Sequence, residues 1–534
     1  MTVYGDVLER ASPRSRAGGA PGLLPADMTA AAMRVVWAWP ALLMFFVGCY
    51  QVTRPELWRD ELSSWSFASR PVPELVDIIS HSNASQLSYY LLLHYWIAAF
   101  GDSVFTMRLL SVLAMTGAAA CVTLVGRRLA GSRAGLLAGL VFALVPSISR
   151  FAQETRFYAL EVLVAMLATL LLLRAIERPA PRRWAAYALC VAVLGYVDLV
   201  ALCLLAGHVA GVAIRWWQQR EMRLAWFGPA ALAGCLACVP MALVGLGQAG
   251  RQVGWIPRPG LSLTAFSFFG RNLFYSTSAA AALIIVAVLA WAVAWRAAAF
   301  ATSVAIAPVV VVWGISQGPV SYFFPRYLLL TIGAWAVLAG IALSKLDLRI
   351  AAAAVMVFGV LVAGDQRVIR EPGAHNWAVY PLNPGTAYWD FSGAATVVAD
   401  GIRPGDGIAY PTGLNRWEMV DYGVEYYLSR DLRAADMPRE VFVSKSAASV
   451  GALYASLCLH PARCLADASR VWIVASGHTK NPWRQLTVNE VAALKPHYRV
   501  ERVIHRHSIS IYLLTRDKPA SGSGRSSGRA PARG

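Results

Sequence analysis

The sequence predicts a mainly α-helical, polytopic membrane protein that carries a small C-terminal α/β domain. Of its 534 residues, 57% are hydrophobic and 15% are charged, and the mean hydropathy is +0.50. A soluble protein of this length needs no such excess of apolar residues. Apolar runs long enough to cross a bilayer recur between residues 34 and 364, and shorter strand-like and helical runs alternate over residues 365–516.

The apolar runs set the number of predicted spans. A helix needs about 20 mostly apolar residues to cross the bilayer core, and on that scale we expect about eleven spans. They cover residues 34–52, 104–126, 133–149, 156–174, 184–199, 201–215, 226–247, 278–295, 299–316, 326–343 and 349–364. The apolar run 87–100 is too short to cross and is interpreted as interfacial or re-entrant.

Basic residues between the runs predict the orientation, because short loops rich in Lys and Arg stay in the cytoplasm. With a cytoplasmic N-terminus, every predicted inner loop is basic. These basic residues are Arg127, Arg128, Arg133, Arg174, Arg178, Arg182, Arg183, Arg215, Arg220, Arg223, Arg296, Lys345 and Arg349. An odd number of spans then places residues 365–516 outside a plasma membrane, with a loop at 53–103 on the same side.

The two ends of the chain are polar. Residues 1–33 predict a disordered cytoplasmic tail, and residues 517–534, rich in Gly, Ser, Pro and Arg, predict a second disordered tail. The tails and the inner loops account for most of the net charge of +18. A nucleic-acid partner would require a basic face on a soluble domain, so membrane lipids are expected partners and nucleic acid is not.

The C-terminal segment has the pattern of a small α/β domain. Strand-like runs "GIAY", "RVWIVAS" and "SISIYLLT" are separated from helical runs such as "FSGAATVVADGI" by turn signals. Cys458 and Cys464 flank "LHPAR" in this segment. Disulfides persist outside the cytoplasm, so the pair predicts a disulfide, with two free buried cysteines as the alternative.

The stretch "LWRDELSSW" follows the first span and contains adjacent acids, Asp60 and Glu61. Trp58 and Trp65 are seven residues apart and fit one helical face, and tryptophan favours the headgroup level of a membrane. The sequence therefore predicts that the carboxylates lie where a lipid headgroup would sit. A solvated helix end is the alternative.

Two further stretches place charge at the outer face. In "SRFAQETRFYALE", the spacing of Arg150, Glu154, Tyr158 and Glu161 suits one side of a helix. Ionisable groups at membrane depth usually face a cavity or a partner, and an ion pair with a neighbouring arginine is the alternative. In "SYFFPRYLLL", the guanidinium of Arg326 could bind phosphate oxygens or simply extend to the interface.

These motifs together resemble the C-type glycosyltransferases. The stretches are the acidic pair, "YYLLLHYWIAAFGDSVFTMRLLSVL", "SRFAQETRFYAL" and "FPRYLL". The layout of residues 34–365 is similar to bacterial relatives of protein O-mannosyltransferases and of the aminoarabinose transferase that modifies lipid A. The resemblance implies a polyprenyl-phosphate sugar as donor, with mannose or a similar sugar passing to a glycan, lipid or protein acceptor in the cell envelope.

The resemblance also assigns roles. The predicted catalytic acids are Asp60, Glu61 and Glu154, and the predicted donor-phosphate ligands are Arg108, Arg156, Arg326 and Tyr327. Cleaving a glycosyl phosphate leaves a dianion that arginines stabilise, and the acceptor hydroxyl must lose a proton to a base. Asp60 is the expected base, acting by direct displacement with inversion, while Glu61 orients the site, holds a metal or pairs with Arg59.

Two points stay open at this level. Many relatives carry His-Pro-Pro where this chain has Ser85, Gln86 and Leu87, which leaves the use of a divalent cation unsettled. Asp198, in "GYVDLVAL", could cap a helix or touch the acceptor. The competing function is a multispan transporter or lipid flippase. Such proteins usually show related halves, and no repeat is visible in this sequence.

Overall fold

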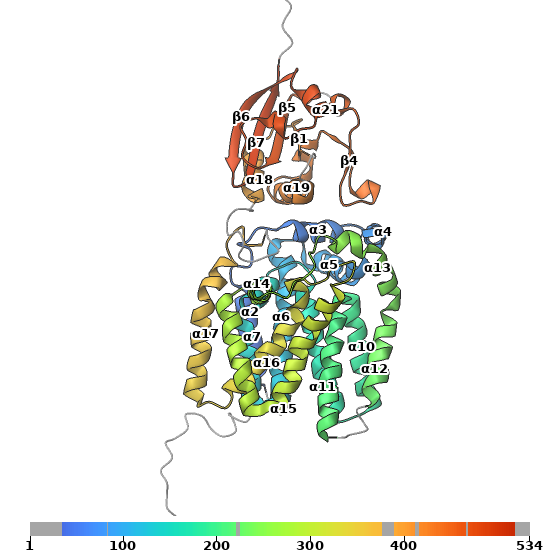
Figure 1. Cartoon of the computed structure of the whole chain (residues 1–534). Helices are drawn as coiled ribbons and strands as arrows, with labels where there is room; N and C mark the ends of the chain where they lie inside the picture. The colour runs from blue at the N-terminus through green and yellow to red at the C-terminus, as the bar shows by residue number, and fades with distance from the viewer. Residues whose placement is uncertain are drawn as a thin grey trace, which may run out of the picture.

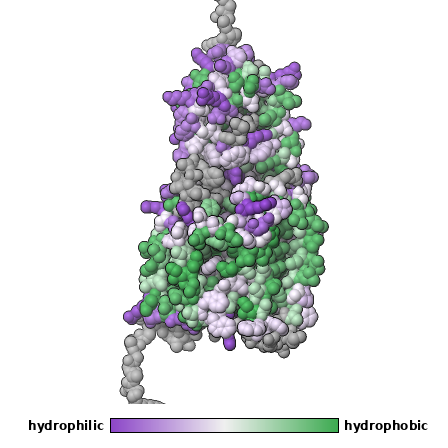
Figure 2. Space-filling model, in the orientation of Figure 1, coloured by the Kyte–Doolittle hydropathy of each residue, from purple (hydrophilic) through white to green (hydrophobic). Residues whose placement is uncertain are grey.

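The computed structural model describes residues 35–82, 84–219, 225–375, 389–411, 416–465 and 468–517. The predicted tail 1–33, and all of the predicted tail 517–534 except its first residue, lie outside these ranges. A bundle of long helices forms one part of the molecule, and the C-terminal α/β domain sits on one end of it (Figure 1). On the face shown in Figure 2, the bundle is mostly apolar, whereas most of the strongly hydrophilic residues gather on the C-terminal domain and at the two ends of the bundle.

The helices of the bundle follow the apolar runs of the sequence. They are α2 (Ala38–Cys49), α6 (Val104–Ala130), α7 (Ser132–Leu144), α8 (Pro146–Ala152), α9 (Tyr158–Glu177), α10 (Pro181–Val197), α11 (Leu204–Gln219), α12 (Phe227–Ala237), α13 (Val239–Val253), α14 (Leu263–Phe274), α15 (Thr277–Ile315), α16 (Ile332–Leu343) and α17 (Leu348–Val368). Short 3-10 turns η2 (Val200–Cys203) and η4 (Pro325–Thr331) lead into α11 and α16. The chain is a multi-pass membrane protein.

The predicted count of eleven spans is not confirmed. Within the described residues, six helices are long and apolar enough to cross a membrane, or eight if each sharply bent pair is one span. The difference has local causes, since α2 has 12 residues and α10 has 17. The two runs predicted at 278–295 and 299–316 both fall within the 39 residues of α15, where two helices meet at a kink at the non-helical Ala294. The count above treats these two helices as one.

Three shorter helices lie between the bundle and the C-terminal domain (Figure 1). They are α3 (Arg59–Ala68), α4 (Val72–Ser82) and α5 (Leu87–Phe100). The 14 residues of α5 are too few to cross a bilayer, in agreement with the interfacial prediction. The segment from α3 to α5 forms the floor on which the C-terminal domain rests.

The C-terminal domain is built on a five-stranded sheet of order β2-β1-β5-β7-β6. Its strands are β1 (Gly407–Ala409), β2 (Arg439–Glu440), β5 (Arg470–Ser476), β6 (Tyr498–Arg506) and β7 (Ile509–Arg516). β1 pairs in parallel with β2 and β5, while β7 pairs antiparallel with β5 and β6. A small antiparallel pair, β3 (Val443–Lys445) and β4 (Ser456–Leu457), stands apart.

Both faces of strand β5 are buried, which explains its continuous apolar sequence. Trp472 and Val474 pack toward α18 (Phe391–Gly401) and α19 (Val420–Asp431), whereas Val471 and Ile473 pack on the other side with α21 (Val488–Leu494). The first of these two cores also contains Leu57, Leu62 and Met107 of the membrane part. The two parts of the molecule therefore share a core rather than meeting only through a linker.

A polar contact reinforces this junction. Glu56 accepts hydrogen bonds from the backbone N–H of Phe391, at 2.9 Å, and from the Ser392 hydroxyl, so it binds the first turn of α18. Burial raises the pKa of Glu56 to about 7, although both hydrogen bonds oppose that shift. The start of α18 is thereby tied to the loop that precedes α3.

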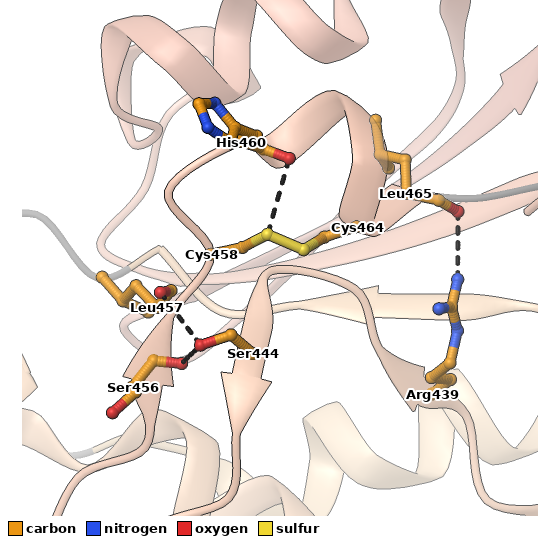
Figure 3. The surroundings of a disulfide bond; sticks show 8 residues. All are labelled: Arg439, Ser444, Ser456, Leu457, Cys458, His460, Cys464 and Leu465. Carbon is orange, nitrogen blue, oxygen red and sulfur yellow. Dashed lines mark hydrogen bonds between the residues drawn. A yellow bond between two sulfur atoms is a disulfide. The ribbon is translucent and has the colours of Figure 1, made fainter.

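Cys458 and Cys464 form the predicted disulfide (Figure 3). It links the residue after β4 to α20 (Pro461–Leu465), with the two Cα atoms 6.5 Å apart. Next to it, the Ser444 hydroxyl donates to the carbonyls of Ser456 and Leu457. The disulfide closes the loop beside the β3–β4 pair. Of the other cysteines, Cys121, Cys190 and Cys238 are buried and free.

Candidate active-site cavity

A cavity of about 680 Å³ lies at the end of the bundle that faces the C-terminal domain. One wall is polar and carries Arg59, Asp60, Tyr90, Arg156, Arg326 and Tyr327. Apolar side chains also line the cavity, among them Leu199, Leu202, Leu246, Val253, Val311 and Ile315. Leu246 and Ile315 are largely exposed, so the apolar part of the lining reaches the surface of the bundle.

Trp58 fixes the start of α3 and hence the position of the acidic pair. It adopts an extended backbone conformation before the helix begins at Arg59, and its indole N–H donates to Glu154 Oε1 at 3.0 Å. The ring is 1% exposed, with the guanidinium groups of Arg150 and Arg326 at 5.9 and 5.8 Å from its centre. The prediction that Trp58 lies at the headgroup surface is therefore wrong, because protein side chains rather than lipid surround it.

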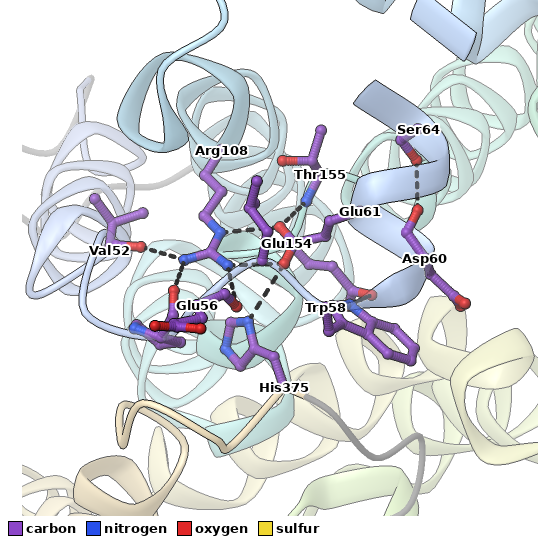
Figure 4. A network of polar contacts seen from close by, with 12 residues as sticks. Val52, Glu56, Trp58, Asp60, Glu61, Ser64, Arg108, Glu154, Thr155 and His375 are labelled. Atoms are coloured by element: carbon purple, nitrogen blue, oxygen red, sulfur yellow. Dashed lines mark hydrogen bonds and ion pairs between the residues drawn. The ribbon is translucent and has the colours of Figure 1, made fainter. Parts of the chain in front are cut away.

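Asp60 and Glu61 are adjacent but point in different directions (Figure 4). Asp60 faces the cavity and is 18% exposed, with Arg326 Nη1 at 3.2 Å and Arg59 Nε at 3.4 Å from its carboxylate oxygens. Burial alone would raise the pKa of Asp60, but Arg326, Arg156 and Arg59 outweigh it and hold the pKa below its ordinary value. Asp60 is thus ionised and sits among cations in the unliganded site.

Glu61 has no exposed surface and does not line the cavity. Arg108 donates to both of its carboxylate oxygens, at 2.9 and 2.7 Å, and the backbone N–H of Thr155 donates to Oε1 at 2.8 Å. Burial opposes ionisation, yet the charge and hydrogen bonds of Arg108 hold the pKa of Glu61 far below its ordinary value. The expected pairing with Arg59 is not formed, because Glu61 points into the protein toward Arg108.

Arg108, a predicted phosphate ligand, is fully buried within this network (Figure 4). Besides Glu61, it donates to the carbonyls of Val52 and Pro55, each at 2.7 Å, and of Glu56 at 3.1 Å. Its guanidinium therefore joins the loop before α3 to α6 and lies outside the cavity lining. The geometry corrects the predicted phosphate contact of Arg108, because its guanidinium is already committed to protein acceptors.

Glu154 forms a buried ion pair with Arg150. The ion pair with a neighbouring arginine that was the alternative for Glu161 is not formed among the described residues. Arg150 Nη1 donates to Glu154 Oε2 at 2.7 Å, and neither of these two side chains is more than 1% exposed. Burial and the nearby charge of Glu61 raise the pKa of Glu154, while Arg150 opposes the rise. Glu154 holds Trp58 in place by accepting its indole N–H and does not line the cavity.

Arg156 and Arg326 both reach the cavity, as expected of phosphate ligands. Arg156 Nη1 donates to the Tyr90 hydroxyl at 2.9 Å. The Arg326 guanidinium lies 5.2–5.8 Å from four aromatic rings, which restrict its position. One of these rings belongs to Tyr327, which also lines the cavity.

Two cavity residues had weak or no signals in the sequence. Arg59 was considered only as a partner of Glu61, but it lines the cavity, and its guanidinium lies 5.4 Å from the Trp417 ring of the C-terminal domain. Asp198 lines the cavity and also acts as the predicted cap. Its Oδ1 accepts from the backbone N–H of Val200 at 3.0 Å, while Oδ2 is buried without a hydrogen-bond partner among the described residues. Contact with the acceptor stays a prediction.

Asp198 differs from Asp60 in its electrostatic environment. Burial raises the pKa of Asp198 to about 7, against the opposing charge of Arg156. Glu161, on α9, is fully buried, and neither of its oxygens has a hydrogen-bond partner among the described residues. The helical spacing of Glu161 in the sequence did not predict that its carboxylate would lie close enough to Asp198 to interact with its charge.

The described residues do not fit a divalent cation. No three His, Cys, Asp or Glu side chains within the described ranges come together as a metal site. Two carboxylates are among the described residues that line the cavity, Asp60, which is paired with Arg326, and Asp198, which accepts from the backbone N–H of Val200. No role in this site is assigned to a metal.

Comparison with known proteins supports the likeness inferred from the motifs. The family model described as dolichyl-phosphate-mannose-protein mannosyltransferase matches residues 87–243. ArnT from Cupriavidus metallidurans in the apo state aligns with a TM-score of 0.56 at 17% identity, over 91% of this chain and 98% of ArnT. The chain has the ArnT fold. The resemblance to C-type glycosyltransferases is thereby confirmed.

ArnT bound to undecaprenyl phosphate gives the same result, with a TM-score of 0.56 at 16% identity over 92% of this chain and 98% of that one. None of the curated protein sequences matches the chain. At these identities the likeness concerns the fold, and the chemistry of the cavity must be argued from its own residues.

Proposed function

We propose that this protein is a glycosyltransferase that moves a sugar from a polyprenyl-phosphate donor to an acceptor outside the cytoplasm. The observation that carries the proposal is the composition of the cavity. Asp60, Arg59, Arg156 and Arg326 line the cavity together with apolar side chains, of which Leu246 and Ile315 are also exposed at the surface of the bundle. An amphiphile with a phosphate and a long apolar chain matches both parts of this lining.

The arginines would bind the donor phosphate. Guanidinium groups match phosphate oxygens through paired hydrogen bonds, and fixed positive charge stabilises the dianion that grows as the glycosyl bond breaks. Arg326 is held in place by its aromatic neighbours and Arg156 by Tyr90. Little reorganisation is therefore needed when the phosphate arrives.

Asp60 would act as the base once the donor is bound. Its carboxylate lies beside the guanidinium groups of Arg326 and Arg59. A donor phosphate would compete for these guanidinium groups and so relieve the depression of the Asp60 pKa. The acceptor hydroxyl then gives its proton to Asp60 while its oxygen attacks the anomeric carbon. The bond from that carbon to the phosphate oxygen breaks, its electron pair leaves with the lipid phosphate, and the anomeric centre inverts.

Glu61 and Glu154 would position this site without touching the substrates. Glu61, through Arg108, joins the loop before α3 to α6, and Glu154 supports Trp58. Each is fully buried and lies outside the cavity lining. Losing either one should disturb the placement of Asp60 rather than remove a reacting group.

Mannose is proposed as the sugar because the matched family model is described by it, and the acceptor is a glycan, lipid or protein of the cell envelope. The basic loops favour a plasma membrane with the N-terminus in the cytoplasm and the C-terminal domain outside.

The proposal is tested by incubating the purified protein with a panel of polyprenyl-phosphate sugars and candidate acceptors. We expect sugar transfer that is lost in Asp60→Asn while donor binding remains. If no donor is consumed, and vesicles containing the protein instead move the lipid between leaflets, the flippase alternative replaces the transferase.

A further inference from the structure

A second cavity, of about 570 Å³, lies at the other end of the bundle from the candidate active site. It is formed where α6 and α9 end and α10 begins. Its charged lining consists of Arg128, Arg174, Glu177, Arg178, Arg182 and Arg183. Five arginines and one glutamate leave this cavity strongly positive.

Internal ion pairs do not neutralise the cavity. Among the described residues, Glu177 is the one acid paired with any of these arginines, and its partner is Arg128. Arg183 Nη1 donates to the carbonyl of Arg178 at 2.6 Å, which closes the turn between α9 and α10. Within the same described ranges, the guanidinium groups of Arg174 and Arg182 make no hydrogen bond or ion pair.

The start of α10 adds to the positive potential. Its N-cap residue, Ala180, provides no side-chain cap, and its first turn contains no acid. Helix N-termini carry partial positive charge and favour anions, yet Arg182 and Arg183 occupy this turn. Cations in that position are unfavourable unless a bound anion compensates them.

The apolar surface next to the cavity identifies the kind of anion. Arg182, Ala186, Leu189 and Val193 are spaced four, three and four residues apart, so they share one face of α10. Ala186 lines the cavity, and Leu189 and Val193 are 67% and 43% exposed on the outside of the bundle. A lipid-facing apolar stripe therefore begins at the arginines and runs toward the middle of the membrane.

We propose that this cavity binds the phosphate groups of an anionic phospholipid from the leaflet at that face, with an acyl chain along the Leu189 stripe. A lipid with two phosphates suits the unpaired arginines best. Basic pockets between the ends of membrane helices suit anionic headgroups, and a free phosphate ion would make no use of the stripe. The site is separate from the candidate active site and independent of the function proposed for it.

Native mass spectrometry of the full-length protein in detergent tests the proposal, with cardiolipin as the probe and phosphatidylcholine and inorganic pyrophosphate as comparisons. We expect saturable binding of cardiolipin, weaker binding of phosphatidylcholine and little binding of pyrophosphate. The double variant Arg174→Gln/Arg182→Gln should weaken cardiolipin binding by about 25-fold, at roughly fivefold for each arginine.

A matched control is Arg296→Gln/Arg349→Gln, which removes the same charge from exposed positions in α15 and α17. It should leave cardiolipin affinity within about twofold of the parent's. Equal losses of affinity in both double variants would mean that general surface charge binds the lipid, and would overturn the proposed site. Leu189→Gln, at an exposed position, tests the apolar stripe without changing the arginines, and it should also weaken cardiolipin binding. Pyrophosphate that binds as tightly as cardiolipin, or affinity unchanged by Leu189→Gln, would contradict a lipid ligand.

Discussion

Asp60→Asn and Glu61→Gln are neighbouring, nearly isosteric changes for which the structure predicts opposite consequences. In Asp60→Asn, the new amide side chain could still fill the space beside Arg326 but could not accept a proton from the acceptor. Loss of a general base typically costs a hundred- to ten-thousand-fold in turnover. Because Asp60 lies at the edge of a cavity and is 18% exposed, the variant should fold and should bind the donor at least as well as the parent.

Glu61→Gln removes the charge that balances a guanidinium with no exposed surface. Breaking one partner of a buried ion pair costs about 3–5 kcal/mol, because the remaining charge is left uncompensated. We therefore expect a large fall in thermal stability and in the yield of folded protein. The activity that survives per folded molecule should exceed that of Asp60→Asn.

The assay combines transfer rates from a polyprenyl-phosphate sugar with thermal unfolding in detergent, measured on the same preparations. Thr116→Ser is a suitable control, since it keeps the hydroxyl that Thr116 donates to the Val112 carbonyl within α6. If Asp60→Asn transfers sugar at nearly the parent rate while stable Glu61→Gln is inactive, the assignment of the base is wrong. If both variants remain fully active, the transferase proposal itself fails.

Four further predictions follow from individual contacts. Arg326→Lys keeps the charge but loses the planar fork, so donor affinity should fall while the unfolding temperature stays near that of the parent; unchanged affinity would make this arginine an anchor of its helix. Burial raises the pKa of Asp198 to about 7. The stabilising contribution of its protonated form is therefore fully present below the pKa of the unfolded chain and is lost as the pH rises through 7. Asp198→Asn should flatten this pH dependence of stability in unfolding scans from pH 5 to 8.5. Cys458→Ser opens the short loop closed with Cys464 and should cost the C-terminal domain about 2 kcal/mol by the chain-entropy estimate; chemical denaturation that shows no difference would remove that contribution. A reporter that requires export, fused after Arg516, should be active, and activity of a cytoplasmic reporter there would reverse the proposed topology.

Several features of the chain could be predicted from local sequence. Apolar runs of spanning length identified a membrane protein, because hydropathy over about 20 residues decides whether a helix enters a bilayer. The β5 run "RVWIVAS" and the spacing of Cys458 and Cys464 likewise predicted a strand and a disulfide that the structure contains. The count of spans was less predictable, since it depends on where the backbone bends, as it does between α7 and α8 and between α12 and α13.

The sequence by itself determined which residue types reach the outer end of the bundle: an acidic pair, arginines and tyrosines at spacings that fit helices. Only the tertiary structure decided that Asp60 faces a cavity while Glu61 is buried against Arg108, and that Arg326 approaches Asp60 from 266 positions away along the chain. The physical reason is that hydropathy and helical periodicity act over one or two turns. Which side of a short helix becomes a cavity wall depends instead on the distant helices packed against it.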